Sequence, residues 1–363
     1  MYSARRDAGN TAVQDSTSEL AAGRVLQLPG DDAGLRALRE LALRAGKDPL
    51  LTQASSGNCS LKAGDVLWIK ASGQWMSDAH GRDFLVPLSL GAVREAVVQG
   101  LEPADYFSGA SLETALHAVM PHRMILHLHS VNAISWAVLA DGAERVTEAL
   151  GRVPWMWIPY MPSGLALGNA IRDALDRRPD AQLFILGNHG VVIGADDEWG
   201  LQSIVDEAER RLAVVPRPLQ RADPAWLSRL SAGTPWNVPE PEALHAVAMD
   251  EAAREILARG FLVPSQAMLT GDRNSDRFRA VPDTCAETAI ASASASTMFL
   301  IIEGRGVLIR QCATPAYAAL LSGLVEVARR ISPSAPVRYL TGQEIVELDS
   351  PRYQNYRTTA YSK

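Results

Sequence analysis

The chain has 363 residues, of which 47% are hydrophobic and 21% are charged, so it can bury a large core and form about two domains. Its formal net charge of −6 argues against a general affinity for nucleic acid or for anionic membranes, because both require a basic surface. We therefore expect small molecules as ligands, and neither a nucleic-acid nor a membrane partner.

Residues 1–30 have the composition of a loose polar tail, and the first twenty lack the apolar core of a signal peptide. Further along, we find no stretch of about 20 apolar residues that would span a membrane. The three cysteines, Cys59, Cys285 and Cys312, are far apart and form no C-x-x-C motif, which favours neither a disulfide framework nor a cysteine metal site. This usage fits a reducing cytoplasm.

The pattern over residues 32–46 predicts an amphipathic helix with an acidic start and a glycine at its end. Two strand-like apolar runs follow, at 59–61 and 65–70. They are bordered by small polar residues at 55–58 and 71–73. Such borders are typical of ordinary hairpin turns, but they can also aim backbone N–H groups and hydroxyls at an anion.

A helix is predicted over 89–99, and another helix, which carries His117, opens near residue 111. Ser111 is a suitable N-cap for this second helix. Glu113 would lie in its first turn, where a carboxylate favours the positive end of the helix dipole. This structural role is one interpretation of Glu113.

Residues 124–130, MILHLHS, have the apolar alternation of a β-strand. Side chains two positions apart on a strand point to the same face, so His127 and His129 project together. The pair predicts either two metal ligands or two histidines on a half-buried face.

Residues 133–140 are predicted to be helical, and Tyr160 and Gly164 lie on a loop before a further helix. Residues 182–193 then form two apolar runs that are split by a tight turn, G-N-H-G, which contains His189. A histidine held there can point out of the sheet toward a site. Asp196 or Asp197 is expected to cap a long helix that ends near residue 215.

Taken in order, the motifs S-G-N, S-G, S-x-E followed four residues later by histidine, H-x-H, P-Y-x-x-x-G and N-H-G resemble the class II aldolase and adducin family. The resemblance covers about residues 35–215. It is strongest to the aldolase half of bifunctional rhamnulose phosphate aldolase and alcohol dehydrogenase proteins. It implies an α/β fold, with an α/β/α layered domain around a central, mainly antiparallel sheet over residues 31–215.

Carried over residue by residue, the resemblance implies a zinc ion, or another divalent metal, bound by His127, His129 and His189. Glu113 would be the catalytic acid and base. The positions that match the family's phosphate-binding residues are Gly57, Asn58, Ser72, Gly73 and Ser111. The resemblance also implies a homotetramer, because the family forms its sites at subunit boundaries.

The chemistry of these residue types agrees with that assignment. Three neutral imidazoles leave a zinc ion with its full charge and an open coordination position. Such an ion can stabilise the enediolate formed when a ketose carbon–carbon bond breaks, and a nearby carboxylate can move the proton. We predict a lyase that cleaves a small ketose phosphate or related hydroxy-keto compound. A decarboxylase, dehydratase or epimerase of the same fold, or a non-catalytic adducin-like binding module, are the alternatives.

The remainder of the chain is predicted to be a linker and a small domain. Residues 216–241 carry six prolines and little periodicity, which is typical of a linker. Residues 242–363 are predicted to form a small α+β domain. It would contain a helix over 242–260, a hairpin over 298–310 and a helix to about 331 that Thr314 caps. No glycine-rich dinucleotide fingerprint follows a strand, so we expect no NAD.

Overall fold

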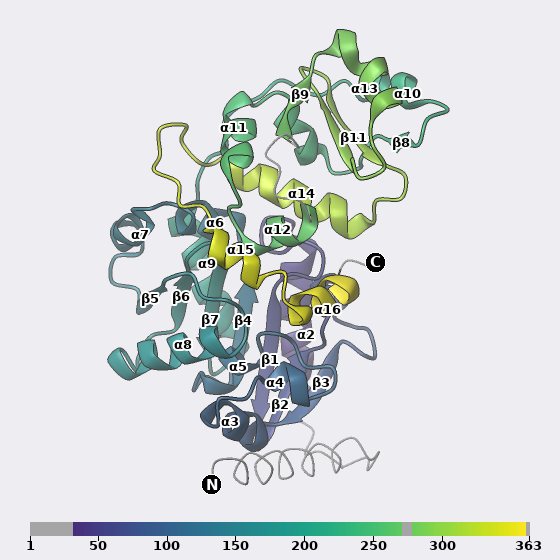
Figure 1. The fold of residues 1–363 in the computed structure, drawn as a ribbon. Coiled ribbons are helices and arrows are strands. Elements are labelled where there is room, and N and C mark those ends of the chain that lie inside the picture. Colours follow the sequence, from purple (N-terminus) through teal and green to yellow (C-terminus); the bar gives the residue numbers. More distant parts are fainter. Residues whose placement is uncertain (1–31, 271–277, 361–363) are drawn as a thin grey trace.

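The computed structural model describes residues 32–270 and 278–360. The whole of the predicted N-terminal tail, 1–30, lies outside these residues. The described chain contains a large sheet with helices on both of its faces, and a smaller unit that lies above one end of this sheet (Figure 1).

The large sheet has seven strands in the order β3-β2-β1-β4-β7-β6-β5. Every neighbouring pair is antiparallel except β5 and β6, which are parallel. This confirms the predicted mainly antiparallel sheet, although β3 and β5 were not predicted. The strands are β1 (Asn58–Ala63), β2 (Val66–Lys70), β3 (Leu85–Ser89), β4 (Met124–Leu128), β5 (Trp155–Ile158), β6 (Leu183–Leu186) and β7 (Gly190–Ala195).

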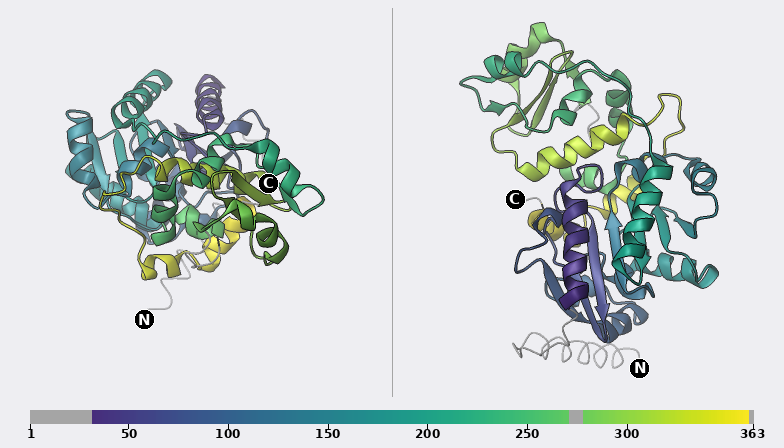
Figure 2. Two further views of the ribbon diagram at one scale, coloured as in Figure 1. Left: turned by 90° about the horizontal axis from the view of Figure 1, so that it is seen from above. Right: turned by 180° about the vertical axis from the view of Figure 1, so that it is seen from behind.

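Helices cover both faces of this sheet, so that the domain has three layers (Figures 1 and 2). One face packs against α2 (Asp32–Lys47), α7 (Gly142–Leu150) and α9 (Glu198–Leu212). The other face packs against α3 (Leu90–Val98), α5 (Thr114–Val119) and α8 (Leu165–Arg177). The helix α6 (Val131–Ala137) follows β4, and the short helices α4 (Pro103–Tyr106) and η1 (Met76–Asp78) lie in connections.

The alternation of β4 decides on which face the histidines lie. Leu126 and Leu128 belong to the core beneath α2 and α9, whereas Ile125 packs beneath α5 and α8. Since side chains alternate along a strand, His127 points to the same side as Ile125. The candidate site therefore forms on the α5 face of the sheet.

The smaller unit contains a four-stranded sheet in the order β8-β11-β10-β9. β10 and β11 form the predicted antiparallel hairpin. The strands are β8 (Trp236–Asn237), β9 (Ala280–Val281), β10 (Phe299–Ile302) and β11 (Gly306–Arg310). The helices that follow α9 in the chain are α10 (Pro224–Ser231), η2 (Glu242–Ala248), α11 (Glu251–Arg259), α12 (Pro264–Thr270), η4 (Asp283–Cys285), α13 (Ala286–Ser292), α14 (Pro315–Ala328), α15 (Gly342–Glu347) and α16 (Pro351–Ala360). Of these, α15 and α16 lie beside the large-sheet domain (Figure 1).

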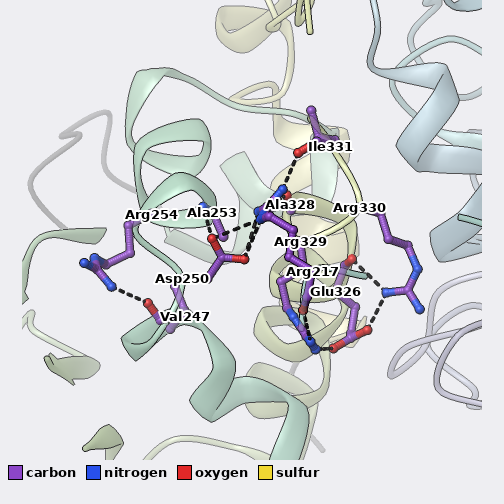
Figure 3. A network of polar contacts seen from close by, with 10 residues as sticks. All are labelled: Arg217, Val247, Asp250, Ala253, Arg254, Glu326, Ala328, Arg329, Arg330 and Ile331. Atoms are coloured by element: carbon purple, nitrogen blue, oxygen red, sulfur yellow. Dashed lines mark hydrogen bonds and ion pairs between the residues drawn. The ribbon is translucent and has the colours of Figure 1, made fainter. Parts of the chain in front are cut away.

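The stretch 216–241, predicted as a linker, contains α10 and β8, and β8 pairs with β11. The first residues of this stretch contact the C-terminal end of α14 and the residues that follow it (Figure 3). Arg217 pairs with Asp250 at 2.9 Å and donates to the carbonyls of Ala328 and Ile331. Arg329 donates to the carbonyl of Arg217 at 2.9 Å. Although its prolines interrupt regular structure, this stretch is packed against the rest of the chain and is not a free linker.

The predicted helix over 242–260 is divided into η2 and α11. Asp250 separates the two, and its carboxylate accepts a hydrogen bond from the amide of Ala253 at 3.0 Å. A carboxylate that caps a new helix interrupts the preceding one. Thr314 caps α14 as expected, by accepting from the amide of Tyr317.

The two parts of the chain share a hydrophobic core. Val131 and Ile134 of α6 pack with residues of α11 and α14 in one buried cluster. Residues 336–338 run beside 138–140, where Arg338 donates its amide to the carbonyl of Val138 at 2.8 Å. Among the helices of 32–270 and 278–360, none combines the length and the hydropathy needed to cross a bilayer.

Candidate active site

The side chains of His127, His129 and His189 converge at one point. Their ring centroids are 4.9 to 5.1 Å apart, and one nitrogen from each ring lies within 4.8 Å of the others. His127 is on β4, His129 follows this strand, and His189 lies in the turn between β6 and β7. The structure therefore brings together the three histidines that were predicted from the sequence as metal ligands.

Two unusual backbone positions place His189 beside β4. Asn188 has a φ of +53°, which asparagine tolerates better than most residues. A Cβ on Gly190 would lie 2.4 Å from the carbonyl oxygen of Leu128, so only glycine allows the turn to approach the strand this closely. The amide of His189 then donates to Leu186 at 3.1 Å and closes the turn.

A backbone contact fixes which nitrogen of His127 faces the other rings. Its Nδ1 donates to the carbonyl oxygen of Val191, on the neighbouring strand β7, at 3.0 Å. In the neutral ring the lone pair is therefore on Nε2, the nitrogen on the site side. Metal-binding histidines are commonly oriented by this kind of contact.

Glu113 is the N-cap residue of α5, so the N-cap lies two residues later than the predicted cap at Ser111. The Ser111 hydroxyl still has a local role, since it accepts a hydrogen bond from the amide of Glu113 at 3.2 Å. The carboxylate of Glu113 makes no capping hydrogen bond. Glu113 therefore lies at the N-terminal end of α5 without capping it through its carboxylate, which points into the site instead.

The carboxylate oxygen Oε1 of Glu113 lies 3.3 Å from Nε2 of His127 and 3.2 Å from Nε2 of His189. Burial disfavours its charged form, but the two histidines outweigh this effect and hold the pKa of Glu113 well below its usual range. Burial disfavours protonation of His127 too, yet the Glu113 carboxylate outweighs it and raises the pKa of His127. Glu113 is thus an ionised carboxylate beside the imidazoles.

The other two histidines are held neutral. Burial, together with the neighbouring His127 and His189, keeps the pKa of His129 well below its usual value. Burial also lowers the pKa of His189. Neutral imidazoles are the form that binds a metal ion.

The donor set fits a divalent cation. Three imidazole nitrogens on one side and an ionised carboxylate at their edge resemble the ligands of catalytic zinc sites, in which three protein ligands leave a position open. A cation among these groups would be stabilised by the negative charge of Glu113. The cluster can therefore hold a metal ion.

A cavity of about 50 Å³ lies beside the histidine cluster, and Glu113, His129 and His189 line it. Four of the five residues predicted to bind phosphate also line the cavity, namely Gly57, Ser72, Gly73 and Ser111. The side chain of Asn58 has another partner, because its amide donates to the Ser111 hydroxyl at 2.7 Å. Asn58 thus orients Ser111, which itself lines the cavity.

The sequence analysis missed several residues of the cavity. Lys70, at the end of β2, lines it and donates to the carbonyls of Ser55 and Gln74 at 3.1 and 2.6 Å. Its position directly before the small residues 71–73 was the feature of the sequence that could have identified it as part of the site. Ser163, in the loop before α8, donates to Glu113 at 3.4 Å. The cavity is completed by Pro264, Ser265, Leu320 and Tyr353, from the C-terminal part of the chain.

Residues 37–201 match the family model described as "Class II Aldolase and Adducin N-terminal domain". The match spans 165 of the 363 residues of the chain. The ordered motifs of the sequence had predicted this family, and the layered α/β architecture agrees with it.

Individual proteins are similar to parts of the chain. A curated protein named "Uncharacterized oxidoreductase YuxG", from Bacillus subtilis (strain 168), is 28% identical over 216 residues, which are 52% of this chain and 30% of that protein. The chain thus spans less than a third of that relative.

Among solved structures, the N-terminal class II aldolase domain of a conserved Thermoplasma acidophilum protein is 21% identical, with a TM-score of 0.44. It covers 51% of this chain and 96% of its own. The L-fuculose-1-phosphate aldolase of Thermus thermophilus is 17% identical, with a TM-score of 0.37, and it covers 50% of this chain and 91% of its own.

Proposed function

We propose that this protein is a zinc-dependent lyase that performs the retro-aldol cleavage of a small ketose phosphate or a related hydroxy-keto compound. The observation that carries the proposal is the placement of the Glu113 carboxylate 3.2 to 3.3 Å from two rings of a three-histidine cluster, at the wall of a cavity. The match of residues 37–201 to the class II aldolase and adducin family model supports the same reaction type.

His127, through its Nε2, would hold the zinc ion together with ring nitrogens of His129 and His189. The bound ion supplies positive charge beside the oxygens of the substrate, where negative charge develops when the carbon–carbon bond breaks. The position of these histidines on β4 and on a closed turn keeps the three donors in place before metal arrives.

Glu113 would carry the proton. As a base, its carboxylate accepts the proton of the hydroxyl on the carbon that becomes the aldehyde, while the carbon–carbon bond breaks and its electron pair passes to the carbonyl fragment. Glu113 then returns the proton to the carbon of that fragment. The low pKa of Glu113 keeps its carboxylate ionised, which is the form that a base requires.

The small polar turns would bind an anionic group of the substrate. Gly57, with a φ of +74°, and Gly73, with a φ of +75°, allow their turns to approach a ligand closely. Ser72 and Ser111 add hydroxyl donors, and Asn58 holds Ser111 in place. Lys70 at the same wall adds a positive charge, which suits a phosphate or carboxylate.

The relative YuxG is named an oxidoreductase, but this chain spans 30% of it. We propose that the part shared with this chain is the lyase and not the part that gives that protein its name. We also propose a homotetramer in the cytoplasm. Light scattering at micromolar concentration tests the tetramer, which a monomer would contradict.

The experiment that tests the function combines metal analysis with a substrate screen. Purified protein should contain one zinc ion per chain and release an aldehyde from at least one member of a panel of ketose phosphates. Release of carbon dioxide or water, or inversion of a stereocentre, would point instead to a decarboxylase, dehydratase or epimerase. Absence of both metal and turnover would favour a non-catalytic binding module.

A further inference from the structure

The cavity beside the histidine cluster is closed by the C-terminal part of the same chain. Ser265 of α12, Leu320 of α14 and Tyr353 of α16 line it together with Glu113. Its volume of about 50 Å³ holds only a few water molecules. A substrate that binds beside the histidines therefore fills this space and touches the C-terminal residues.

The helix α16 is fixed against the loop that precedes α8. Arg352 forms an ion pair with Glu102 and donates to the carbonyl of Ser163 at 3.1 Å. Glu102 in turn accepts a hydrogen bond from the amide of Leu165 at 2.9 Å. These contacts join residues that are about 190 and 250 positions apart in the chain, so α16 is positioned by the N-terminal domain itself.

Tyr353 is the residue of α16 that reaches the cavity. Its side chain is buried, and its ring packs in a cluster with Leu112, Leu340 and Leu348. Its hydroxyl donates to the carbonyl of Ser163 at 3.3 Å, and the hydroxyl of Ser163 donates to Glu113 at 3.4 Å. Tyr353 and Glu113 are thus both hydrogen-bonded to Ser163, Tyr353 to its carbonyl and Glu113 to its hydroxyl.

The Tyr353 hydroxyl is available as a donor. Burial raises the pKa of Tyr353 to about 12, so the hydroxyl keeps its proton at any physiological pH. Its present hydrogen bond is long, and a substrate oxygen in the cavity would offer a closer acceptor. The backbone carbonyl of Ser163 also accepts from Arg352, so it retains a partner if Tyr353 turns away.

We propose that Tyr353 is a substrate-contacting residue supplied in cis, whose hydroxyl donates a hydrogen bond to a carbonyl or hydroxyl oxygen of the sugar-type substrate. Arg352 is a positioning residue that holds α16 in place. The inference rests on the proposed lyase function for the identity of the substrate. Each active site is then completed by the C-terminal helix of its own chain.

The first test compares Tyr353→Phe with Tyr339→Phe. Both changes remove a hydroxyl that donates to a backbone carbonyl, but Tyr339 donates to Ile256 at 3.1 Å and does not line the cavity. With the substrate found in the screen, Tyr353→Phe should lower kcat/KM by about three- to tenfold, as expected for one lost hydrogen bond. Tyr339→Phe should leave kcat/KM unchanged, and both variants should keep zinc. Equal kcat/KM for Tyr353→Phe and wild type would overturn the inference while the lyase function stands.

If the screen yields no substrate, the lyase proposal fails but Tyr353 is still tested, by calorimetric titration of zinc-loaded protein with dihydroxyacetone phosphate. Weaker binding to Tyr353→Phe than to wild type and Tyr339→Phe supports the contact. Equal binding, or no binding to wild type, overturns it.

Co-expression of Glu113→Gln with Tyr353→Phe decides whether Tyr353 acts in cis. If each chain completes its own site, mixed oligomers contain one lesion in every site and gain no activity over the two variants alone. If α16 closed a neighbour's site, random mixing would restore about a quarter of the sites and of the activity. That recovery would overturn the in-cis assignment.

Discussion

Asn188 accepts a hydrogen bond of 2.6 Å at its Oδ1 from Nη1 of Arg338, which lies 150 positions later in the chain. The Asn188 amide group also donates to the carbonyls of Leu262 and Arg338, at 2.8 Å each. All three contacts are made by the residue before His189. The turn that presents one histidine of the cluster is therefore held by the C-terminal part of the chain.

From this relationship we expect Arg338→Ala to lower the free energy of unfolding by about 1–3 kcal/mol, because it leaves the buried Asn188 oxygen without its charged donor. Urea denaturation measures the change. Arg259→Ala serves as control, since Arg259 makes an exposed ion pair with Glu255 within α11 and its loss should cost less than about 0.5 kcal/mol. A similar decrease in the free energy of unfolding for both variants would show that the contact with Asn188 stabilises the fold no more than an exposed ion pair does.

The histidine cluster predicts which single changes remove the metal. His129→Ala and His189→Ala should each reduce the zinc content of purified protein to a small fraction of one ion per chain, because a site with two histidines binds far more weakly. Plasma emission spectrometry measures the zinc. His80→Ala, which alters an exposed histidine paired with Glu40 at 3.3 Å, should keep the full complement. Full zinc content in folded His129→Ala and His189→Ala would refute the ligand assignment.

Lys62 gives a prediction about pH. It lies in β1, and its ammonium donates to the carbonyls of Met120 and His122, yet burial lowers its pKa to about 7. Because the pKa in the unfolded chain is near 10.5, the unfolded state binds more protons than the folded state between pH 7 and 10. The wild-type protein should therefore gain stability relative to Lys62→Met as the pH rises through this window, by about 1 kcal/mol per unit.

Urea denaturation of both proteins at pH 7, 8 and 9 checks this difference. Lys62→Met removes the titration and approximately keeps the volume of the side chain. Lys47→Met, on the last turn of α2, should show the same pH dependence as wild type, because Lys47 is exposed. If the free energies of unfolding of wild type and Lys62→Met change equally with pH, Lys62 stays charged while it donates to its two carbonyl acceptors.

The sequence predicted the parts of the fold that carry strong local patterns. The alternation in β4 placed His127 and His129 on one face, and the apolar runs at 182–193 predicted β6, β7 and the turn with His189. The edge strand β3 was missed because Pro87 interrupts a short run, which is tolerated only where the strand amide needs no partner. The four residues of β5 were too few for a periodic signal.

The C-terminal side of the cavity had no local signal. Nothing in the sequence around Tyr353 shows that it packs near Glu113, because this proximity depends on the ion pair between Arg352 and Glu102. The same is true of Arg338, which reaches Asn188 only after the two parts of the chain have packed together. Ser111 shows the limit of local reasoning at a helix start, since the helix begins at Thr114 and the cap position falls on the catalytic candidate.

If Glu113 moves the proton in a lyase reaction at the histidine cluster, single-turnover aldehyde release must slow in Glu113→Gln. The change keeps the size of the side chain but removes its proton-accepting carboxylate. Glu326→Gln is the control, because Glu326 is a buried carboxylate paired with Arg329 at 2.6 Å outside the cavity. We expect a rate lower by a factor of about 10² to 10⁴ for Glu113→Gln, with zinc still bound, and a wild-type rate for Glu326→Gln. Zinc-loaded Glu113→Gln that releases aldehyde at the wild-type rate would contradict this role of Glu113.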